Sequence, residues 1–304
     1  MTSGGGFPGF SPHADVVLVL LTFGVGYWWA TSRVAPASRR QRGWFVSGLL
    51  LVWAASSWPV HDIAEDRLYF VHMVQHVTFT FIAPPMLLLG TPTRLVSWLV
   101  RPLAVRAVVR ACTQPLVALV GFNLIVGLSH LQLVVDGATS SAPLHFAVHL
   151  VLFASALCLW CPVLNRAPEL PRMRSTGKML YLMANGFLPV PIVAALALAG
   201  APFYDHYVDA PPLWGISPLD DQQLAAGAMW MLESFWTIGA VTIVFFDWWR
   251  TEQRDPATAS LPEHIRRRPP GEGPGPPRPG PLPGAAGSVA VLSGRQGPPS
   301  AAEP

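Results

Sequence analysis

The chain has 304 residues, of which 51% are hydrophobic and only 12% are charged, and its formal net charge is +3. Soluble domains usually carry about 25% charged residues, so this composition excludes an ordinary water-soluble domain and indicates a membrane protein. The basic residues lie in short segments beside apolar runs, a distribution that sets membrane topology and excludes a nucleic-acid-binding patch.

Seven apolar runs follow one another along the chain, and each is close to the roughly 20 residues that cross a bilayer as a helix. They cover residues 15–31, 43–60, 69–90, 115–135, 143–164, 178–200 and 224–249. We therefore expect an all-α membrane protein in which residues 15–250 form a seven-transmembrane helix bundle within the lipid bilayer. Ala83-Pro84-Pro85 in the third run, and Pro189 and Pro191 in the sixth, predict helix kinks or breaks, because proline cannot donate a helix hydrogen bond.

The segments between the runs differ sharply in their basic residues. Each segment after runs one, three and five contains several Lys or Arg residues, whereas the alternate segments contain only Arg67. The positive-inside rule then predicts an outward-facing N-terminus, a cytoplasmic C-terminus and an odd number of spans in the plasma membrane. Residues 1–14 would form an outer segment. Residues 251–304, rich in Pro and Gly and without apolar periodicity, would form a disordered cytoplasmic tail.

Histidines gather toward the predicted outer side of the bundle. His72 and His76, and likewise His145 and His149, are spaced i, i+4, so each pair presents two imidazoles on one helix face. A rise of about 1.5 Å per residue places His76, His130 and His149 at similar depths, with Met229 of the seventh run near the same level. The sequence thus predicts one shared metal or haem site built from these residues: His72, His76, His130, His145, His149 and Met229. His13 and His264 are expected to lie outside it.

Residue type alone leaves the nature of this site open. Imidazole binds zinc, iron and copper, and a thioether such as Met229 suits copper(I). A single membrane histidine often serves only as a hydrogen-bonding group between helices, but ionisable groups in a membrane are costly and usually functional. Glu233 is interpreted either as a proton or metal partner or as a carboxyl kept neutral by burial. For Cys158-x-x-Cys161 we favour packing at a helix end over metal binding.

Several motifs together resemble the membrane-integral CtaG family of cytochrome c oxidase assembly factors. The third run contains His72-Met73-Val74-Gln75-His76, followed by the segment Ala83-Pro84-Pro85-Met86-Leu87-Leu88-Leu89-Gly90-Thr91-Pro92. Further agreement comes from Gln114-Pro115-Leu116 with Asn123 and His130, from His145 and His149, and from Asp221-Gln222-Gln223-Leu224-Ala225 before Met229-Trp230. The chain departs from the family pattern at Ala226 and at Leu232-Glu233-Ser234.

The resemblance implies a non-enzymatic assembly factor for haem-copper oxidase that handles copper at the outer face of the membrane and contacts oxidase subunits. The residues themselves leave two other classes open. One is a haem-binding electron-transfer protein, with axial histidines from the third and fifth runs. The other is an intramembrane zinc hydrolase in which Glu233 or Asp136 acts as the base, although the chain contains no H-E-x-x-H motif.

Overall fold

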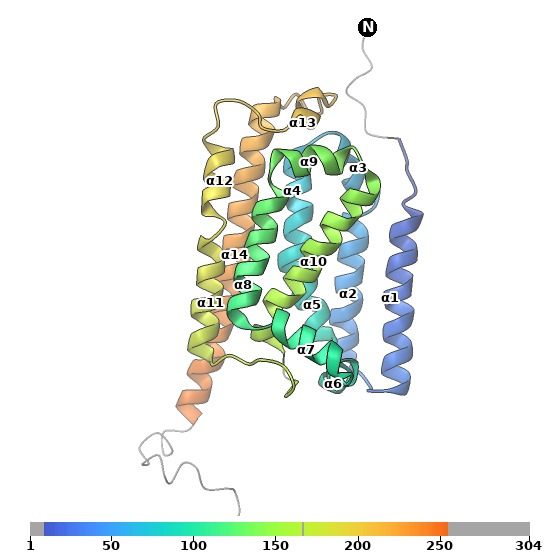
Figure 1. Cartoon of the computed structure of the whole chain (residues 1–304), viewed down its shortest axis with the longest axis vertical. Helices are drawn as coiled ribbons and strands as arrows, with labels where there is room; N and C mark the ends of the chain where they lie inside the picture. The colour runs from blue at the N-terminus through green and yellow to red at the C-terminus, as the bar shows by residue number, and fades with distance from the viewer. Residues whose placement is uncertain (1–8, 166, 255–304) are drawn as a thin grey trace, which may run out of the picture. The chain divides into compact units, whose positions relative to one another are not determined.

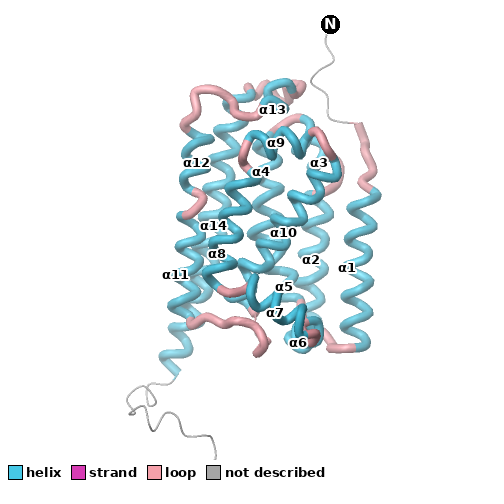
Figure 2. Tube along the Cα trace, in the orientation of Figure 1, coloured by secondary structure: helices cyan, strands magenta, loops and turns pink. Residues whose placement is uncertain are grey.

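The computed structural model describes residues 9–165 and 167–254. The predicted tail therefore lies outside the described residues from position 255 onward, as does His264. Helices make up the described ranges, and no strand is present in them (Figures 1 and 2). The elements are α1 (Ala14–Arg33), α2 (Arg39–Ala55), α3 (Val60–Asp66), α4 (Tyr69–Val77), the π-helical turn η1 (Thr78–Ile82), α5 (Ala83–Gly90), α6 (Thr93–Leu99), α7 (Leu103–Cys112), α8 (Pro115–Ser129), α9 (Gln132–Thr139), α10 (Ala142–Leu164), α11 (Ser175–Phe187), α12 (Val190–Ala197), α13 (Asp205–Asp209) and α14 (Pro218–Arg254).

Five helical stretches are long and apolar enough to cross a membrane: 14–33, 69–90, 142–164, 175–197 and 218–253. Two bent pairs raise the number of candidate spans to seven, namely α2 with α3, bent by 46°, and α7 with α8, bent by 71°. The helices thus fit a multi-pass membrane protein with five to seven spans.

The fourth predicted run is too long. Its helix, α8, ends at Ser129 rather than near residue 135, and the chain then turns at Leu131 into α9. The side chains of Ser129 and His130 both donate to the carbonyl of Val126, which satisfies a carbonyl in the last turn of the helix. The apolar pattern continues through this turn, so it gave no signal for the helix end.

Prolines shape the third and sixth spans. Pro84 has no N–H to donate to the carbonyl of Thr80, and the indole Nε1 of Trp160 donates to that carbonyl instead, at 2.9 Å. The π-helical turn η1 ends at Ile82, just before Ala83-Pro84-Pro85. In the sixth span, α11 ends at Phe187 and α12 begins at Val190, which confirms the predicted break at Pro189.

The core lies between α4, α8, α10, α14 and the α11–α12 pair, which pack around Tyr69, Met73, Phe81 and Phe122. Helix α1 is at the edge of the bundle and is mostly exposed (Figure 1). Helices α2 and α5 cross closely at Gly90, where an added Cβ would lie 2.6 Å from the backbone nitrogen of Phe45. Tyr27 of α1 donates to the carbonyl of Gly90 at 2.9 Å.

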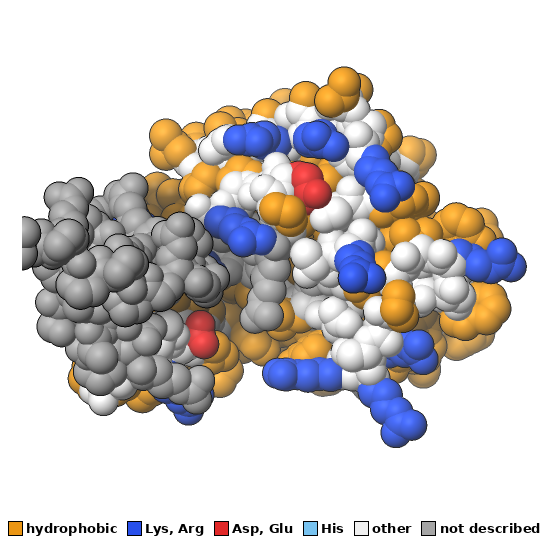
Figure 3. Space-filling view, turned by 90° about the horizontal axis from the view of Figure 1, so that it is seen from below, with side chains coloured by type: hydrophobic (Ala, Val, Ile, Leu, Met, Phe, Trp, Pro, Cys, Tyr) orange, Lys and Arg blue, Asp and Glu red, His pale blue; other side chains and the backbone are white. Residues whose placement is uncertain are grey.

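The two ends of the bundle carry opposite charge. Basic side chains lie across the end formed by α6 and α7, here called the α6 end (Figure 3). The opposite end, with α3, α9 and α13, is here called the α3 end. Its segments contain one basic residue, Arg67, and several acidic ones: Asp62, Glu65, Asp66, Asp136, Asp205, Asp209, Asp220 and Asp221. The fold therefore gathers at one end the basic segments that the positive-inside rule assigns to the cytoplasm.

Candidate metal centre

Three histidines from two helices form a compact group near the α3 end. His72 and His76 lie one turn apart on α4, and His149 lies on α10. Each offers one ring nitrogen, and the three nitrogens lie within 4.8 Å of one another. We call these residues the inner triad. The Nε2 atoms of His76 and His149 are 3.3 Å apart although the residues are 73 positions apart in the chain.

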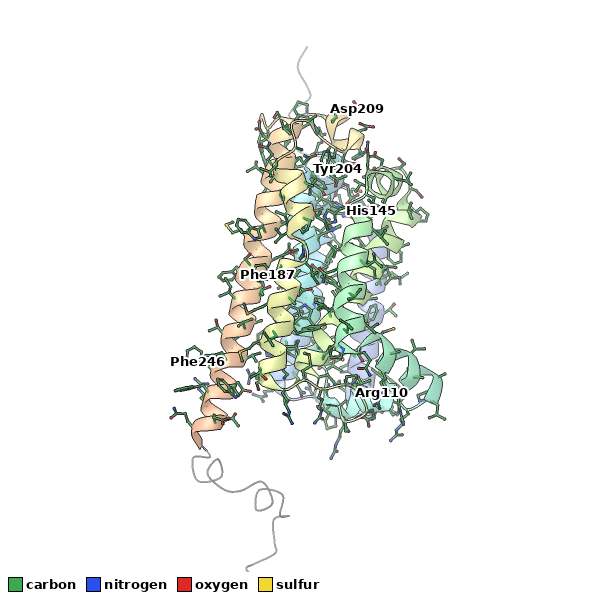
Figure 4. The ribbon with its side chains drawn as sticks, turned by 60° about the vertical axis from the view of Figure 1, so that its left-hand side comes forward. Arg110, His145, Phe187, Tyr204, Asp209 and Phe246 are labelled. Atoms are coloured by element: carbon green, nitrogen blue, oxygen red, sulfur yellow. The ribbon has the colours of Figure 1, made fainter. Side chains whose placement is uncertain are left out.

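The inner triad lines a cavity of about 20 Å³, which has room for little more than one water molecule or a metal ion. Its other walls come from α8, α9 and α10 and are mostly apolar, including Val134, Val135 and Val148. Figure 4 shows His145 toward the same end of the bundle as Tyr204 and Asp209, with Arg110 toward the opposite end. An ion in this cavity would be enclosed by imidazoles and aliphatic side chains.

His130 and His145 lie next to the inner triad. The ring of His145 is 4.3 Å from that of His149, and the ring of His130 is 6.4 Å from that of His76. His130 donates its Nδ1 proton to the carbonyl of Val126 at 2.7 Å, so Nε2 of the neutral ring carries a lone pair. The Nε2 atoms of both His130 and His145 are buried and have no hydrogen-bond partner among the described residues. Buried imidazole nitrogens without a partner are costly, and a bound metal ion is one way to satisfy them.

The carboxylate of Glu65, on α3, contacts two of these histidines, His72 and His145. Its Oε1 lies 3.2 Å from Nδ1 of His72, and its Oε2 lies 3.0 Å from Nδ1 of His145. A carboxylate that accepts the Nδ1 proton of an imidazole fixes the tautomer, leaves Nε2 free to bind a metal ion and makes that nitrogen more basic. Glu65 therefore occupies the position of the carboxylate behind the histidine ligands of a metal site.

Neighbouring helices hold α3 and α4 in place. Asp221 of α14 accepts the backbone N–H groups of Tyr69 and Phe70, at 2.7 and 3.0 Å, so a carboxylate from a distant helix caps the start of α4. Gln75 donates to the carbonyl of Ala55 at 2.8 Å and to Nδ1 of His61 at 3.1 Å, which joins α4 to the end of α2 and to α3.

Helix α13 fixes α3 from the other side. Tyr207 donates its hydroxyl to the carbonyl of Ala64 at 2.9 Å, and burial raises the pKa of this hydroxyl well above its usual range, so it remains a donor. His206 donates to the backbone carbonyl of Glu65 at 2.7 Å. The carboxylate of Glu65 thus projects from a backbone that is held at two consecutive carbonyls.

The structure brings five of the six predicted ligands, all histidines, close to one another, and the sixth is Met229. Met229 is buried in the main hydrophobic core with Met73 and Ala225 and does not line the cavity of the inner triad. Asp136 and Glu233 also do not line this cavity. Cys161 packs with Val100 and Leu170 in a separate cluster.

Sequence reasoning missed three residues near this site: His13, His61 and Glu65. His61 and Glu65 are spaced i, i+4, the same signal that identifies the other two histidine pairs, but they follow an apolar run, so the sequence assigns them to an outer segment. His13 was expected to lie outside the site, and it does not line the cavity of the inner triad; its Nε2 is 3.0 Å from Asp62 and its ring is 4.7 Å from that of His61.

Comparison with known proteins gives one match. A family model described as cytochrome c oxidase caa3 assembly factor (Caa3_CtaG) matches residues 19–251, which include all the helices that carry the site. No curated protein and no solved structure matches the chain.

Proposed function

The chain belongs to the cytochrome c oxidase caa3 assembly factor family, and on that premise we propose that it binds copper at the inner triad and delivers it to an oxidase subunit. In this proposal the protein is not an enzyme. It lies in the plasma membrane with the α3 end outside and the α6 end in the cytoplasm, so the copper site faces the outer side. The distribution of basic residues between the two ends supports this orientation.

The observation that carries the proposal is the convergence of His72, His76 and His149 on one small cavity. Imidazole nitrogens are good ligands for copper, and three of them leave room for a fourth ligand. A cargo ion must be released again, and a ligand from the receiving subunit would take that fourth position. Because Met229 lies in the core, the proposed copper site consists of imidazoles without a thioether.

His130 and His145 adjoin the site as additional imidazoles. Their unpartnered Nε2 atoms supply alternative ligands next to the inner triad. An ion could exchange an imidazole of the inner triad for one of these two, one ligand at a time, and so move while most of its ligands stay bound. This arrangement suits a carrier better than a permanent structural site, whose ligand set is closed.

The cavity favours a metal ion over the two alternative functions. The cavity at the inner triad has room for little more than one water molecule or ion, which favours a small ion over a haem group at these three histidines. For a zinc hydrolase, the expected bases Glu233 and Asp136 do not line the cavity, and Glu65 is engaged with His72 and His145.

Metal analysis of the purified protein tests the proposal. Wild-type protein loaded with copper should retain the metal without a Soret band, and the His72→Ala/His76→Ala variant should bind at least one copper ion fewer per chain. Cells that carry this variant should lose oxidase activity while the protein remains in the membrane. An unchanged copper content in the double variant, or a Soret band in the wild type, would overturn the copper-carrier function.

A further inference from the structure

A second group of metal-ligand side chains lies beside the inner triad. His61 and Glu65 lie one turn apart on α3, and His145 lies at the start of α10. Each offers one ligand atom, and these atoms lie within 4.8 Å of one another. We call them the α3 triad. His145 Nδ1 is 3.0 Å from Glu65 Oε2, and His61 Nδ1 is 4.0 Å from Glu65 Oε1.

The α3 triad is nearer the solvent than the inner triad. The side chains of His61 and Glu65 are 20% and 17% exposed, whereas that of His72 is 10% exposed. Acidic residues surround it, because Asp62 and Asp66 flank Glu65 on the same short helix. An ion that approaches the α3 end therefore meets this group in a negative environment.

The donor atoms of the two groups differ in kind. The inner triad offers imidazole nitrogens alone, whereas the α3 triad combines two imidazoles with a carboxylate. Two histidines and one carboxylate, with an open fourth position, are a ligand set that suits divalent ions such as Zn²⁺ and Cu²⁺. For such an ion His145 would offer Nδ1, the ring nitrogen that faces Glu65, with its proton moved to Nε2, which has no hydrogen-bond partner among the described residues.

Glu65 connects the two groups physically. One of its oxygens lies 3.2 Å from Nδ1 of His72 in the inner triad, and the other belongs with His145 in the α3 triad. A cation bound to Glu65 would compete with His72 for the carboxylate. It would also place a second positive charge close to the first ion, because His145 of the α3 triad and His149 of the inner triad have their rings only 4.3 Å apart. Each ion should therefore weaken the binding of the other.

We propose that His61, Glu65 and His145 form a second metal-ion site, selective for divalent ions of the zinc and copper class, whose occupation loosens the ion in the inner triad. The coupling rests on the proposed function of the inner triad, whereas the second site itself does not. Filling of the α3 triad from the outer side would thus promote release of the ion held deeper in the bundle.

Titration of the full-length detergent-purified chain with Zn²⁺, against a competing chromophoric chelator, tests both parts. Three variants are informative: His61→Asn, which removes only the α3 triad; His76→Asn, which removes only the inner triad; and the double variant. Wild type should bind two ions, the second at least about tenfold more weakly than either single variant binds its one ion. The double variant should bind none, and Asp209→Asn, which neutralises an exposed carboxylate at the same end, should match the wild type.

The outcomes separate the two proposals. Two ions bound by His61→Asn would overturn the second site. Two ions bound by wild type with the affinities of the single variants would overturn the coupling. If His61→Asn binds no ion while His76→Asn binds one, the inner triad holds no metal and the proposed copper site fails, but the α3 site stands. Monodisperse elution of each variant shows that a lost ion reflects a lost ligand rather than unfolding.

Discussion

The Nε2 atoms of His76 and His149 lie 3.3 Å apart. Two nitrogens bound to one tetrahedral ion, with metal–nitrogen bonds of about 2.0–2.1 Å, are separated by about 3.3 Å. Helices α4 and α10 therefore already hold these two imidazoles at the spacing of ligands to a single ion. A preorganised pair reduces the ordering that metal binding would otherwise require.

Replacing Glu65 with Gln should weaken metal binding at the inner triad by about 10–100-fold, because His72 loses its ionised acceptor. The affinity is best measured in the His61→Asn background, where the α3 triad is removed and only the ion at the inner triad contributes to the measurement. Asp209→Asn in the same background is the control and should leave the affinity unchanged. An affinity unaffected by Glu65→Gln would show that the carboxylate does not act through the histidines.

Replacing Asp221 with Ala should lower stability by roughly 1–3 kcal/mol, because the buried N–H groups of Tyr69 and Phe70 lose their acceptor. Thermal unfolding in detergent measures this change. The neighbouring Asp220 is exposed and interacts with Ser217, so Asp220→Ala should cost much less. Equal losses in the two variants would contradict the role of Asp221 as a cap of α4.

Replacing Gly90 with Ala should destabilise the packing of α2 on α5 by about 1–3 kcal/mol or more, since the new Cβ would lie 2.6 Å from the backbone nitrogen of Phe45. Backbone atoms at this crossing cannot rotate away. Gly121 of α8 has no atom within 4 Å of an added Cβ, so Gly121→Ala should leave the melting temperature unchanged or slightly higher. A silent Gly90→Ala variant would show that the two helices can separate at little cost.

The sequence predicted the helical class and the histidine pairs because both depend on local spacing. Apolar runs and i, i+4 histidines can be read without knowing how helices pack. Whether Met229 faces the cavity or the hydrophobic core depends on the rotation of α14 about its own axis, which depth alone does not reveal. The end of α8 at Ser129 and the approach of Glu65 to His72 likewise depend on side-chain contacts across the fold.

Reporter fusions test the proposed orientation. A reporter at residue 3 should be outside the cell and one after residue 270 should be cytoplasmic, because an odd number of spans places the two chain ends on opposite sides of the membrane. Five or seven spans give this result equally, so cysteine labelling at Asp209 and Arg106 should accompany the fusions. Asp209 should react with an impermeant reagent after substitution by Cys, and Arg106→Cys should not. Both chain ends on one side would contradict the orientation.

Single and double histidine variants test whether the inner triad is one unit. His76→Ala, His149→Ala and the double variant should all lower oxidase assembly to a similar level, because loss of either ligand disables the same ion and residues of one unit are not additive. The protein should remain in the membrane in all three, and added copper should partly restore the two single variants by mass action. Oxidase activity and immunoblots of membranes measure both quantities, with His264→Ala as the control. If His76 and His149 only form a structural hydrogen bond between α4 and α10, a different result is expected. Abundance would then fall together with activity, copper would restore nothing, and the pair of imidazoles 3.3 Å apart would be a structural contact.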